Sequence, residues 1–414
     1  MTGNIDVEAL RAQFPALAKT MNGEPVVYFD GPAGSQVPSK VIDAITNYLT
    51  SHNANHGGPF LTSSETDAVL HGAHEKVAMF LGADTGNSIA FGANMTSLTL
   101  SLSRALARTW QAGDEIIVSW LDHDANVTPW VLAAQDAGVE VHHIEVDATD
   151  CTLDFDDYRD KLCAKTKLVA VGLASNATGT INPVQSMICE AHAIGALTFI
   201  DAVHYAPHGL IDVSSLDCDF LACSAYKFFG PHVGILYGKE ELLTNLQPYK
   251  LRPATDDLPS KWMNGTQNHE CIAGVAAGID YLVELGRSLT DAADERAALK
   301  ACFDAIVDYE TSLAWPLIEW LSQQDDVRVW GITDRSRSNE RVPTISFTHT
   351  SKPPQQIAER LAEAGIFAWP GNHYALPFTE AMGLEPDGTL RVGLLHYNTK
   401  AEVQRLIDVL ETIL

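Results

Sequence analysis

Short apolar segments alternate with longer amphipathic segments over the first 285 residues. Several apolar segments lack polar positions, as expected for strands that are covered on both faces. The predicted strands are 87–93, 114–120, 139–146, 167–175, 196–203, 219–226 and 233–238, and the predicted helices between them include 95–111, 125–138 and 183–195. The last two helices end in Gly138 and Gly195, which fit C-caps. This alternation predicts an α/β fold with a mainly parallel seven-stranded sheet between helices and right-handed crossovers.

After residue 285 the pattern changes to a compact α+β unit. A charged helical segment, 288–324, predicts a helix–helix connection. It precedes predicted strands at 327–332, 342–349, 366–371 and 389–399 and predicted helices at 353–365 and 400–414. We therefore expect three parts: an N-terminal segment, 1–20, packing with the small domain; a large domain, 21–285; and a small C-terminal domain, 286–414.

Charge and cysteine content restrict the class of protein. The 53 acidic residues against 27 basic ones give a formal net charge of −26, which argues against nucleic acid or an anionic membrane as a partner. The seven cysteines show no CxxC pair, so we expect free thiols and no metal site. The N-terminus lacks the basic and apolar regions of a signal peptide, and no apolar span is long enough for a membrane, which together predict a cytoplasmic protein.

Candidate chemistry appears at the ends of two predicted strands. Asp201 ends one apolar strand, and Lys227 follows the next one, after Ser224 and Tyr226. Taken alone, Asp201 could cap a helix and Lys227 could be a surface charge at a turn. Together they suit a cationic heterocycle, because pyridoxal 5'-phosphate needs a lysine for its Schiff base and a carboxylate at its pyridine nitrogen. Ligands of such sheets lie at the carboxyl ends of the strands.

The sequence resembles a known family at this point. The stretches FDGPAGSQVPSKVIDAI, FGANMTSLTL, LDHDANVTPW, ASNATGTINPV, FIDAVHYAPH, CSAYKFFGPHVGILYG, WMNGTQN and RVGLLHYNT occur in the order typical of class V aminotransferases. They are most similar to the cysteine desulfurase and selenocysteine lyase branch, and they span nearly the whole chain. The resemblance implies fold type I of the enzymes that use pyridoxal phosphate (PLP).

The resemblance also implies roles for residues around the cofactor ring. Lys227 matches the Schiff-base lysine and Asp201 the carboxylate at the ring nitrogen. His123 matches the histidine that stacks on the ring; a lone histidine would more often cap a helix or lie in the core, but here the whole motif outweighs that interpretation. Asn176 and His204 match residues near the phenolic oxygen, and Asn176 could equally form a turn before Gly179.

The phosphate of the cofactor is expected at the helix that begins near Asn94. Ala93, Asn94 and Met95 would bind it chiefly through the main chain, because helix N-termini suit phosphates. Ser224 matches a phosphate-binding serine. Tyr226 replaces a common family histidine, and it could donate to the phosphate or only pack.

Two further matches concern the partner subunit and the substrate. Thr266, in WMNGTQN, resembles a residue that crosses a dimer interface, which implies a homodimer with shared active sites. Arg391 matches the arginine that binds the α-carboxylate of a small amino-acid substrate, a bidentate contact that a lysine serves poorly. Side-chain selectivity is expected in 53–67, which contains Phe60, and in 370–378.

The main departure from the family lies in 370–378. Tyr374 stands where cysteine desulfurases have a reactive cysteine, and no cysteine follows Cys302. Because persulfide formation needs a thiolate, ordinary cysteine desulfuration is not expected. Tyr374 and His373 could shape the side-chain pocket or relay a proton, and Tyr374 could equally be inert.

Three hypotheses for function remain open. The first is a C–S or C–Se lyase or β-eliminase that acts on a small amino acid through an external aldimine. The second is an aminotransferase, or an epimerase, using the same residues. The third is a non-catalytic protein of this fold, against which the joint presence of Lys227, Asp201, His123 and Arg391 argues.

Overall fold

The larger of the main sheets has the seven strands that the apolar pattern predicts. The computed structural model describes residues 5–414. The strands are β4 (Ile89–Gly92), β5 (Glu115–Ser119), β6 (Glu140–Ile144), β7 (Thr166–Gly172), β8 (Leu197–Asp201), β9 (Phe220–Ser224) and β10 (Gly234–Gly238). Their spatial order is β4-β10-β9-β8-β7-β5-β6. Only β10 is antiparallel to its neighbours, so the sheet is mixed and mainly parallel, which confirms the predicted α/β fold.

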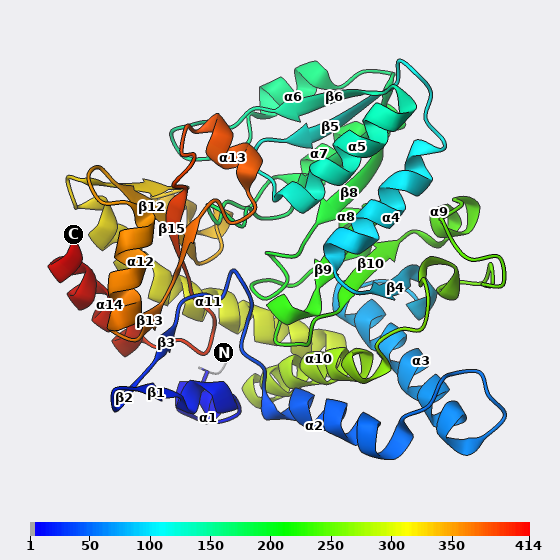
Figure 1. Cartoon of the computed structure of the whole chain (residues 1–414), viewed down its shortest axis with the longest axis horizontal. Helices are drawn as coiled ribbons and strands as arrows, with labels where there is room; N and C mark the ends of the chain where they lie inside the picture. The colour runs from blue at the N-terminus through cyan, green and yellow to red at the C-terminus, as the bar shows by residue number, and fades with distance from the viewer. Residues whose placement is uncertain (1–4) are drawn as a thin grey trace.

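Helices cover both faces of this sheet (Figure 1). On β5 the side chains alternate, with Ile116 and Val118 in one buried cluster and Ile117 in the other. One face packs on α4 (Met95–Ala107) and α5 (Thr128–Ala137). The other face packs chiefly on α3 (Leu61–Leu81), α7 (Val184–Ala193), α10 (His269–Leu289) and part of α11 (Glu295–Ser322). Burial on both faces explains why these strands lack polar positions.

The predicted ends of two helices agree with the backbone. Gly138 is the C-cap of α5 and adopts the left-handed conformation at φ 70°. Gly195 has φ 81° and follows Ile194, the C-cap of α7. Both glycines therefore occupy the left-handed positions that end helices most often. Smaller helices of this part are α2 (Ser39–Asn47), α6 (Phe155–Lys161), α8 (Val213–Leu216) and α9 (Glu240–Asn245).

The C-terminal part is built on an antiparallel four-stranded sheet of order β11-β12-β15-β14. Its strands are β11 (Val327–Trp330), β12 (Thr344–His349), β14 (Trp369–Gly371) and β15 (Thr389–Gly393). The helices α12 (Pro354–Glu363), α14 (Lys400–Ile413) and the second half of α11 share a hydrophobic core with it, and α13 (Leu376–Ala381) follows β14. The predicted α+β unit is therefore present.

Two predicted strands in this part have different boundaries in the structure, so these predictions were wrong. The predicted strand 366–371 divides into β13 (Ile366–Phe367), which pairs with β3 (Val27–Tyr28), and β14. The predicted strand 389–399 ends at Gly393, because the chain then turns, with Asn398 capping the backbone N–H of Leu395 at 2.8 Å. Pairing with distant partners and side-chain capping decide these boundaries, and neither is visible in the apolar pattern.

The N-terminal residues pack against the C-terminal part. Arg11 of α1 (Val7–Arg11) forms an ion pair with Glu402 of α14 at 2.8 Å. A short hairpin of β1 (Thr20–Met21) and β2 (Glu24–Pro25) follows. Residues 1–4 of the predicted N-terminal segment lie outside the described residues, and its assignment as a separate part stays a prediction. The division at residues 20 and 285 stays a prediction.

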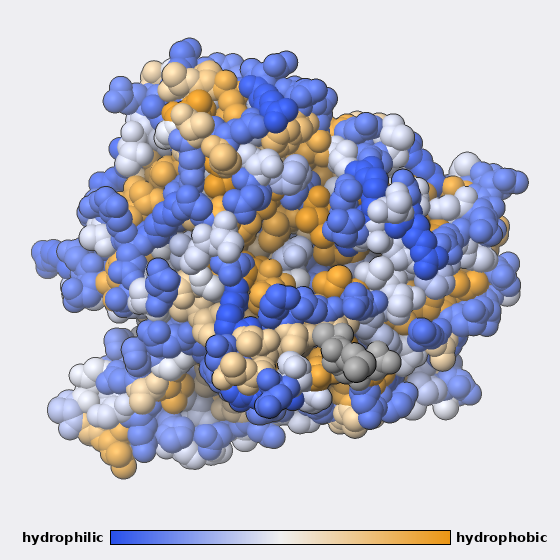
Figure 2. All heavy atoms as spheres, turned by 180° about the vertical axis from the view of Figure 1, so that it is seen from behind, coloured by the Kyte–Doolittle hydropathy of each residue, from blue (hydrophilic) through white to orange (hydrophobic). Residues whose placement is uncertain are grey.

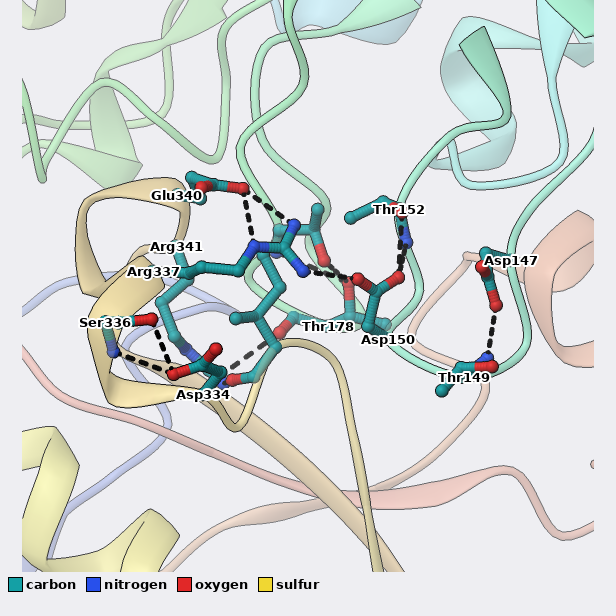
Figure 3. Close-up of polar contacts among 12 residues, drawn as sticks. Asp147, Thr149, Asp150, Thr152, Thr178, Asp334, Ser336, Arg337, Glu340 and Arg341 are labelled. Carbon is teal, nitrogen blue, oxygen red and sulfur yellow. Dashed lines mark hydrogen bonds and ion pairs between the residues drawn. The ribbon is translucent and has the colours of Figure 1, made fainter. Parts of the chain in front are cut away.

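A polar network joins the C-terminal part to loops of the large sheet (Figure 3). Arg337 pairs with Asp150 at 2.6 Å and with Glu340 at 2.7 Å. The buried Arg341 donates to the carbonyls of Thr178 and Thr344. Gly179, at φ 80°, leaves no room for a Cβ, which would meet the Thr344 carbonyl oxygen at 2.6 Å. The network therefore fixes the loop after β7, which contains Asn176.

Among residues 5–414, no helix is both long and apolar enough to cross a membrane. The surface is predominantly hydrophilic in the view of Figure 2.

Candidate active site

The carboxyl ends of the central strands open into one cavity. It is lined by residues that follow β5, β7, β8 and β9 and by the first turn of α4. The predicted site residues His123, Asn176, Asp201 and Lys227 all lie in it. This is the position expected for a ligand site in a sheet of this type.

Lys227 lies in a single 3-10 turn directly after β9. The turn continues through Phe229, which adopts φ 69° and whose N–H donates to the Ser35 hydroxyl at 2.7 Å. The lysine Nζ donates to the carbonyl of Pro32. Burial lowers the pKa of Lys227 to about 7, with a further contribution from the positive charge of Arg391. A substantial fraction of this amine is therefore uncharged at neutral pH, as a nucleophilic amine requires.

Asp201 is the last residue of β8 and is 7% exposed. Its Oδ1 accepts a hydrogen bond from the Val203 N–H at 2.8 Å, so the carboxylate also shapes the turn that follows the strand. Burial raises the pKa of Asp201 to about 6, and the charge of Lys227 opposes this rise. The two groups thus face one cavity and influence each other electrostatically.

His123 and Asn176 are held by the loop that contains Tyr374. The His123 and Tyr374 rings are nearly parallel, with centroids 5.7 Å apart. The Asp124 N–H donates to the Tyr374 carbonyl at 2.7 Å, and Asn176 Nδ2 donates to the His373 carbonyl at 2.9 Å. His373 and Tyr374 both have positive φ, 58° and 57°. The loop is therefore held at two points to segments that line the cavity, with its backbone in a conformation that costs energy.

The first turn of α4 reaches the cavity because Gly234 lacks a side chain. A Cβ on Gly234 would lie 2.3 Å from the backbone carbon of Asn94. The Met95 N–H donates to the Ser224 hydroxyl at 3.1 Å. The Asn94 side chain caps the helix by accepting from the Ser97 N–H at 2.9 Å. Ala93 is exposed and does not line the cavity.

His204 and Tyr226 also line the cavity. His204 Nε2 is 2.9 Å from the Thr344 hydroxyl oxygen, and burial lowers the pKa of His204 well below its usual value. The Tyr226 ring stacks on His232 with centroids 5.0 Å apart. Lys227 Nζ lies 5.1 Å from the centroid of the Tyr226 ring, so Tyr226 is both packed and next to the amine.

Arg391 lies on β15 and is 5% exposed. It donates to the Asn176 carbonyl at 2.8 Å. Burial lowers the pKa of Arg391 to about 9, and the nearby Asp30 opposes this. Asp30 has a buried oxygen, Oδ1, without a hydrogen-bond partner, and burial raises its pKa to about 6. A guanidinium without a carboxylate in direct contact, beside this cavity, can receive an anionic group.

Six predicted site residues are not among those that line this cavity: Phe60, Ala93, Thr266, His373, Tyr374 and Arg391. His373, Tyr374 and Arg391 contact residues of the site, as described above, whereas Thr266 and Phe60 lie elsewhere. Thr266 lies in a separate surface hollow, which Asn55 and His56 also line. Phe60 immediately precedes α3 and is 55% exposed. Within one chain, neither residue lies among those that line the cavity around Lys227.

Four polar residues that line the cavity were not predicted from the sequence: Thr96, Asp122, Ser175 and Asn182. Asp122 directly precedes His123, so its place in the same motif could have identified it. Asn182 donates to the Gly172 carbonyl at 2.8 Å and has a buried, unpartnered Oδ1. It lies six residues after Asn176 in the matching stretch ASNATGTINPV, so its place in that motif could have identified it.

One cluster among residues 5–414 has the spacing of a metal site: Glu115, Glu140 and His142. Glu115 and Glu140 begin β5 and β6, at the opposite edge of the sheet from the cavity. Glu115 pairs with His142 at 3.1 Å and lies 3.5 Å from Lys165, so a cation already neutralises part of its charge.

Comparison with known proteins gives one consistent family. The family model described as "Aminotransferase class-V" matches residues 27–406. The chain is 34% identical over 417 residues to a probable cysteine desulfurase of Vibrio cholerae, covering 97% of each. It is 30% identical over 437 residues to a cysteine desulfurase of Haloferax volcanii, covering 98% of this chain and 96% of the relative.

Solved structures agree with this result. The apo cysteine desulfurase of Thermococcus onnurineus has a TM-score of 0.88 at 27% identity, covering 100% of this chain and 99% of the other. A cysteine desulfurase of Escherichia coli has a TM-score of 0.84 at 28% identity, and the match covers 99% of this chain and 98% of the other. The structure is therefore of the fold type I seen in these desulfurases. Since the family model and the relatives extend over nearly the whole length, this chain is an enzyme of the class V aminotransferase family.

Proposed function

We propose that the chain is a PLP-dependent enzyme acting on a small amino acid. The observation that supports this best is the pairing of the Lys227 amine and the Asp201 carboxylate in one cavity beside the first turn of α4. The residues present fit the cofactor: two cationic groups, Lys227 and Arg391, have pKa values lowered by burial and lack a contacting carboxylate. When bound, PLP acts as an electron sink for charge that develops on the substrate α-carbon.

Each side chain has a role in this proposal. Lys227 would hold the cofactor covalently and move a proton at the substrate α-carbon. Asp201 would hold the ring nitrogen, His123 would stack on the ring, and Asn176 and His204 would lie beside it. Ser224, the first turn of α4 at Asn94 and Met95, and Tyr226 bind the phosphate, to which Thr96 is a further neighbour. Ala93 has no side chain beyond Cβ, so its only possible contribution is through the main chain. Arg391 binds the substrate carboxylate through its planar pair of donors.

We propose C–S or C–Se lyase or β-elimination chemistry without a persulfide-forming cysteine. The similar proteins bear the name cysteine desulfurase, and this supports a substrate that carries sulfur or selenium on its β-carbon. Among residues 5–414 no cysteine lines the cavity. Tyr374 is next to His123 and is 74% exposed. A phenol cannot accept sulfur from a substrate, so sulfur would leave as a free product.

Transamination, or epimerisation, is the alternative. After the uncharged Lys227 amine has taken the α-proton, the site of reprotonation would separate these reactions. A proton returned to the cofactor would lead to transamination, and a proton returned to the α-carbon from the opposite face would lead to epimerisation. Incubation of the purified protein with single amino acids tests the choice. Pyruvate and ammonia from cysteine-like substrates support the lyase, whereas conversion of the cofactor to its amine form supports the aminotransferase. No turnover and no visible cofactor absorbance across a broad panel would contradict both.

Replacing Tyr374 with cysteine is expected to create a sulfur acceptor at the cavity. With cysteine as substrate, Tyr374→Cys should accumulate protein-bound persulfide, detected by alkylation and mass spectrometry. The wild-type protein should show none and should release sulfide instead. Leu376→Cys is the matched control, because Leu376 is 37% exposed and lies two residues further on. Equal labelling of the wild-type protein and Tyr374→Cys would contradict the proposal.

We also propose a cytoplasmic homodimer with shared active sites. Thr266 and Phe60 lie outside their own cavity, and exposed apolar side chains gather nearby, including Leu49, Phe60 and Leu61. Figure 2 shows apolar surface at the projecting corner that α2 and α3 form. Thr266 would then contact the phosphate in the partner's cavity, and Phe60 would lie near the partner's substrate.

Mixing two inactive variants tests this arrangement. Lys227→Ala and Thr266→Arg should each be nearly inactive alone. After unfolding and refolding together, hybrid dimers would contain one site with both native residues, so about a quarter of wild-type activity should return. Light scattering establishes the dimer independently. If the hybrid dimers recovered no activity, the proposal that the two subunits share each active site would be contradicted.

A further inference from the structure

We propose that Asp122 is a second carboxylate of the cofactor site, a positioning residue that controls the protonation of Asp201. The inference rests on the proposed function, because Asp201 is important there as the partner of the ring nitrogen. The sequence resemblance assigns no role to Asp122. Its place in the fold shows how it would act.

The carboxylate of Asp122 occupies the side-chain space of Gly172. A Cβ on Gly172 would lie 2.7 Å from Asp122 Oδ1. Gly172 ends β7, and its register partner on β8 is Asp201. Side chains of paired residues point to the same face, and neighbouring strands are about 4.8 Å apart. The two carboxylates are therefore close neighbours on one face of the sheet, 4% and 7% exposed.

Hydrogen bonds hold Asp122 in this place. The Ser119 hydroxyl donates to Oδ2, and Asn126 Nδ2 donates to Oδ1 at 3.0 Å. The orientation of the Asn126 amide is defined by Trp130, whose Nε1 donates to Asn126 Oδ1 at 3.1 Å. Every residue of this network is buried. The carboxylate is therefore fixed beside Asp201 and cannot turn towards water.

Two buried carboxylates at this separation resist ionising together. Burial raises the pKa of Asp122 to about 7, and the charge of Asp201 raises it further. The other titratable groups that face the pair are His123, His204, Tyr226 and Lys227 in the cavity, Cys223 on β9 and Arg391 on β15. An ionised Asp122 therefore opposes ionisation of Asp201, which is the form of Asp201 that a cationic ring beside it would need.

The first test uses the protein without cofactor. A carboxyl group with a raised folded-state pKa contributes stability below its unfolded-state pKa and loses it as the pH rises through the folded value, here about 7. The Asp122 carboxyl should therefore contribute a fall in Tm between pH 5 and pH 8. Over this range the wild-type Tm should fall by about 2 °C or more relative to that of Asp122→Asn, because the buried histidines contribute equally to both proteins. Asp124→Asn, in the same motif, should follow the wild type, because its carboxylate bonds to the Thr128 hydroxyl instead.

The second test measures the dissociation constant of PLP from pH 5 to pH 8. Removing the like charge should let Asp201 ionise more easily, so the midpoint of the affinity profile should move down by about one pH unit in Asp122→Asn. Asp122→Glu should restore most of the wild-type midpoint. Gly172→Ala, which displaces the carboxylate without removing it, should shift the midpoint in the same direction as Asp122→Asn.

The outcomes separate the two proposals. If PLP binds and the Asp122→Asn profiles of Tm and affinity both superimpose on those of the wild type, the role of Asp122 is overturned. If no variant binds PLP, the proposed function fails, and the Tm profiles still decide whether Asp122 and Asp201 share a proton.

Discussion

Replacing Lys227 with alanine is expected to abolish covalent attachment of the cofactor and to lower turnover by at least about a thousandfold. The variant loses the amine placed to form the covalent bond and to move the substrate proton. Wild-type protein with PLP should show a visible absorbance band and a gain in mass after reduction with borohydride. Lys227→Ala should show neither.

A second variant distinguishes the loss of the nucleophilic amine from the loss of its positive charge. Lys227→Arg retains a cation but has no nucleophilic amine, so it should be as inactive as Lys227→Ala. Attachment should also depend on pH. Because burial lowers the pKa of Lys227 to about 7, the rate of attachment should rise with pH up to about 7 and then level off. Full absorbance and turnover in Lys227→Ala would refute the assignment.

The architecture could be predicted because its pattern is local. Strands covered on both faces need apolar residues at every position, and helices of one turn per 3.6 residues separate them. All seven strands of the large sheet were found where the sequence indicates. The errors lie where distant partners decide, as in 366–371, which divides because Ile366 and Phe367 pair with β3.

The candidate site could be predicted where a residue follows a strand within a recognisable motif. Lys227, Asp201, His123 and Asn176 meet in one cavity for this reason. Asp122 precedes His123 in the same motif, but its position against Gly172, next to Asp201, arises only when the strands come together in the fold. Asn94 was expected to offer its main chain to the phosphate, and the additional capping bond of its side chain to Ser97 depends on local geometry.

A second buried polar pair was not predictable, since its members are far apart in the sequence. His208 Nδ1 lies 2.7 Å from Glu310 Oε2, and the side chains are 5% and 1% exposed. The His208 ring is 5.7 Å from that of His204, which lines the cavity. Burial raises the pKa of Glu310, and His208 opposes this rise. The pair thus connects helix α11 to the loop that follows Asp201.

Glu310→Ala is expected to lower the free energy of unfolding by about 3 kcal/mol or more, because it leaves the buried His208 without its partner. Alanine preserves helix propensity, so the loss would come from the pair and not from α11 itself. Glu319→Ala is the matched control on the same helix. Glu319 pairs with Arg335 at 2.7 Å, but the two side chains are 45% and 70% exposed, and the expected loss is below about 1 kcal/mol. Denaturant unfolding at fixed pH and cofactor concentration measures both. Equal losses in the two variants would show that the His208–Glu310 pair does not stabilise the fold beyond an ordinary surface ion pair.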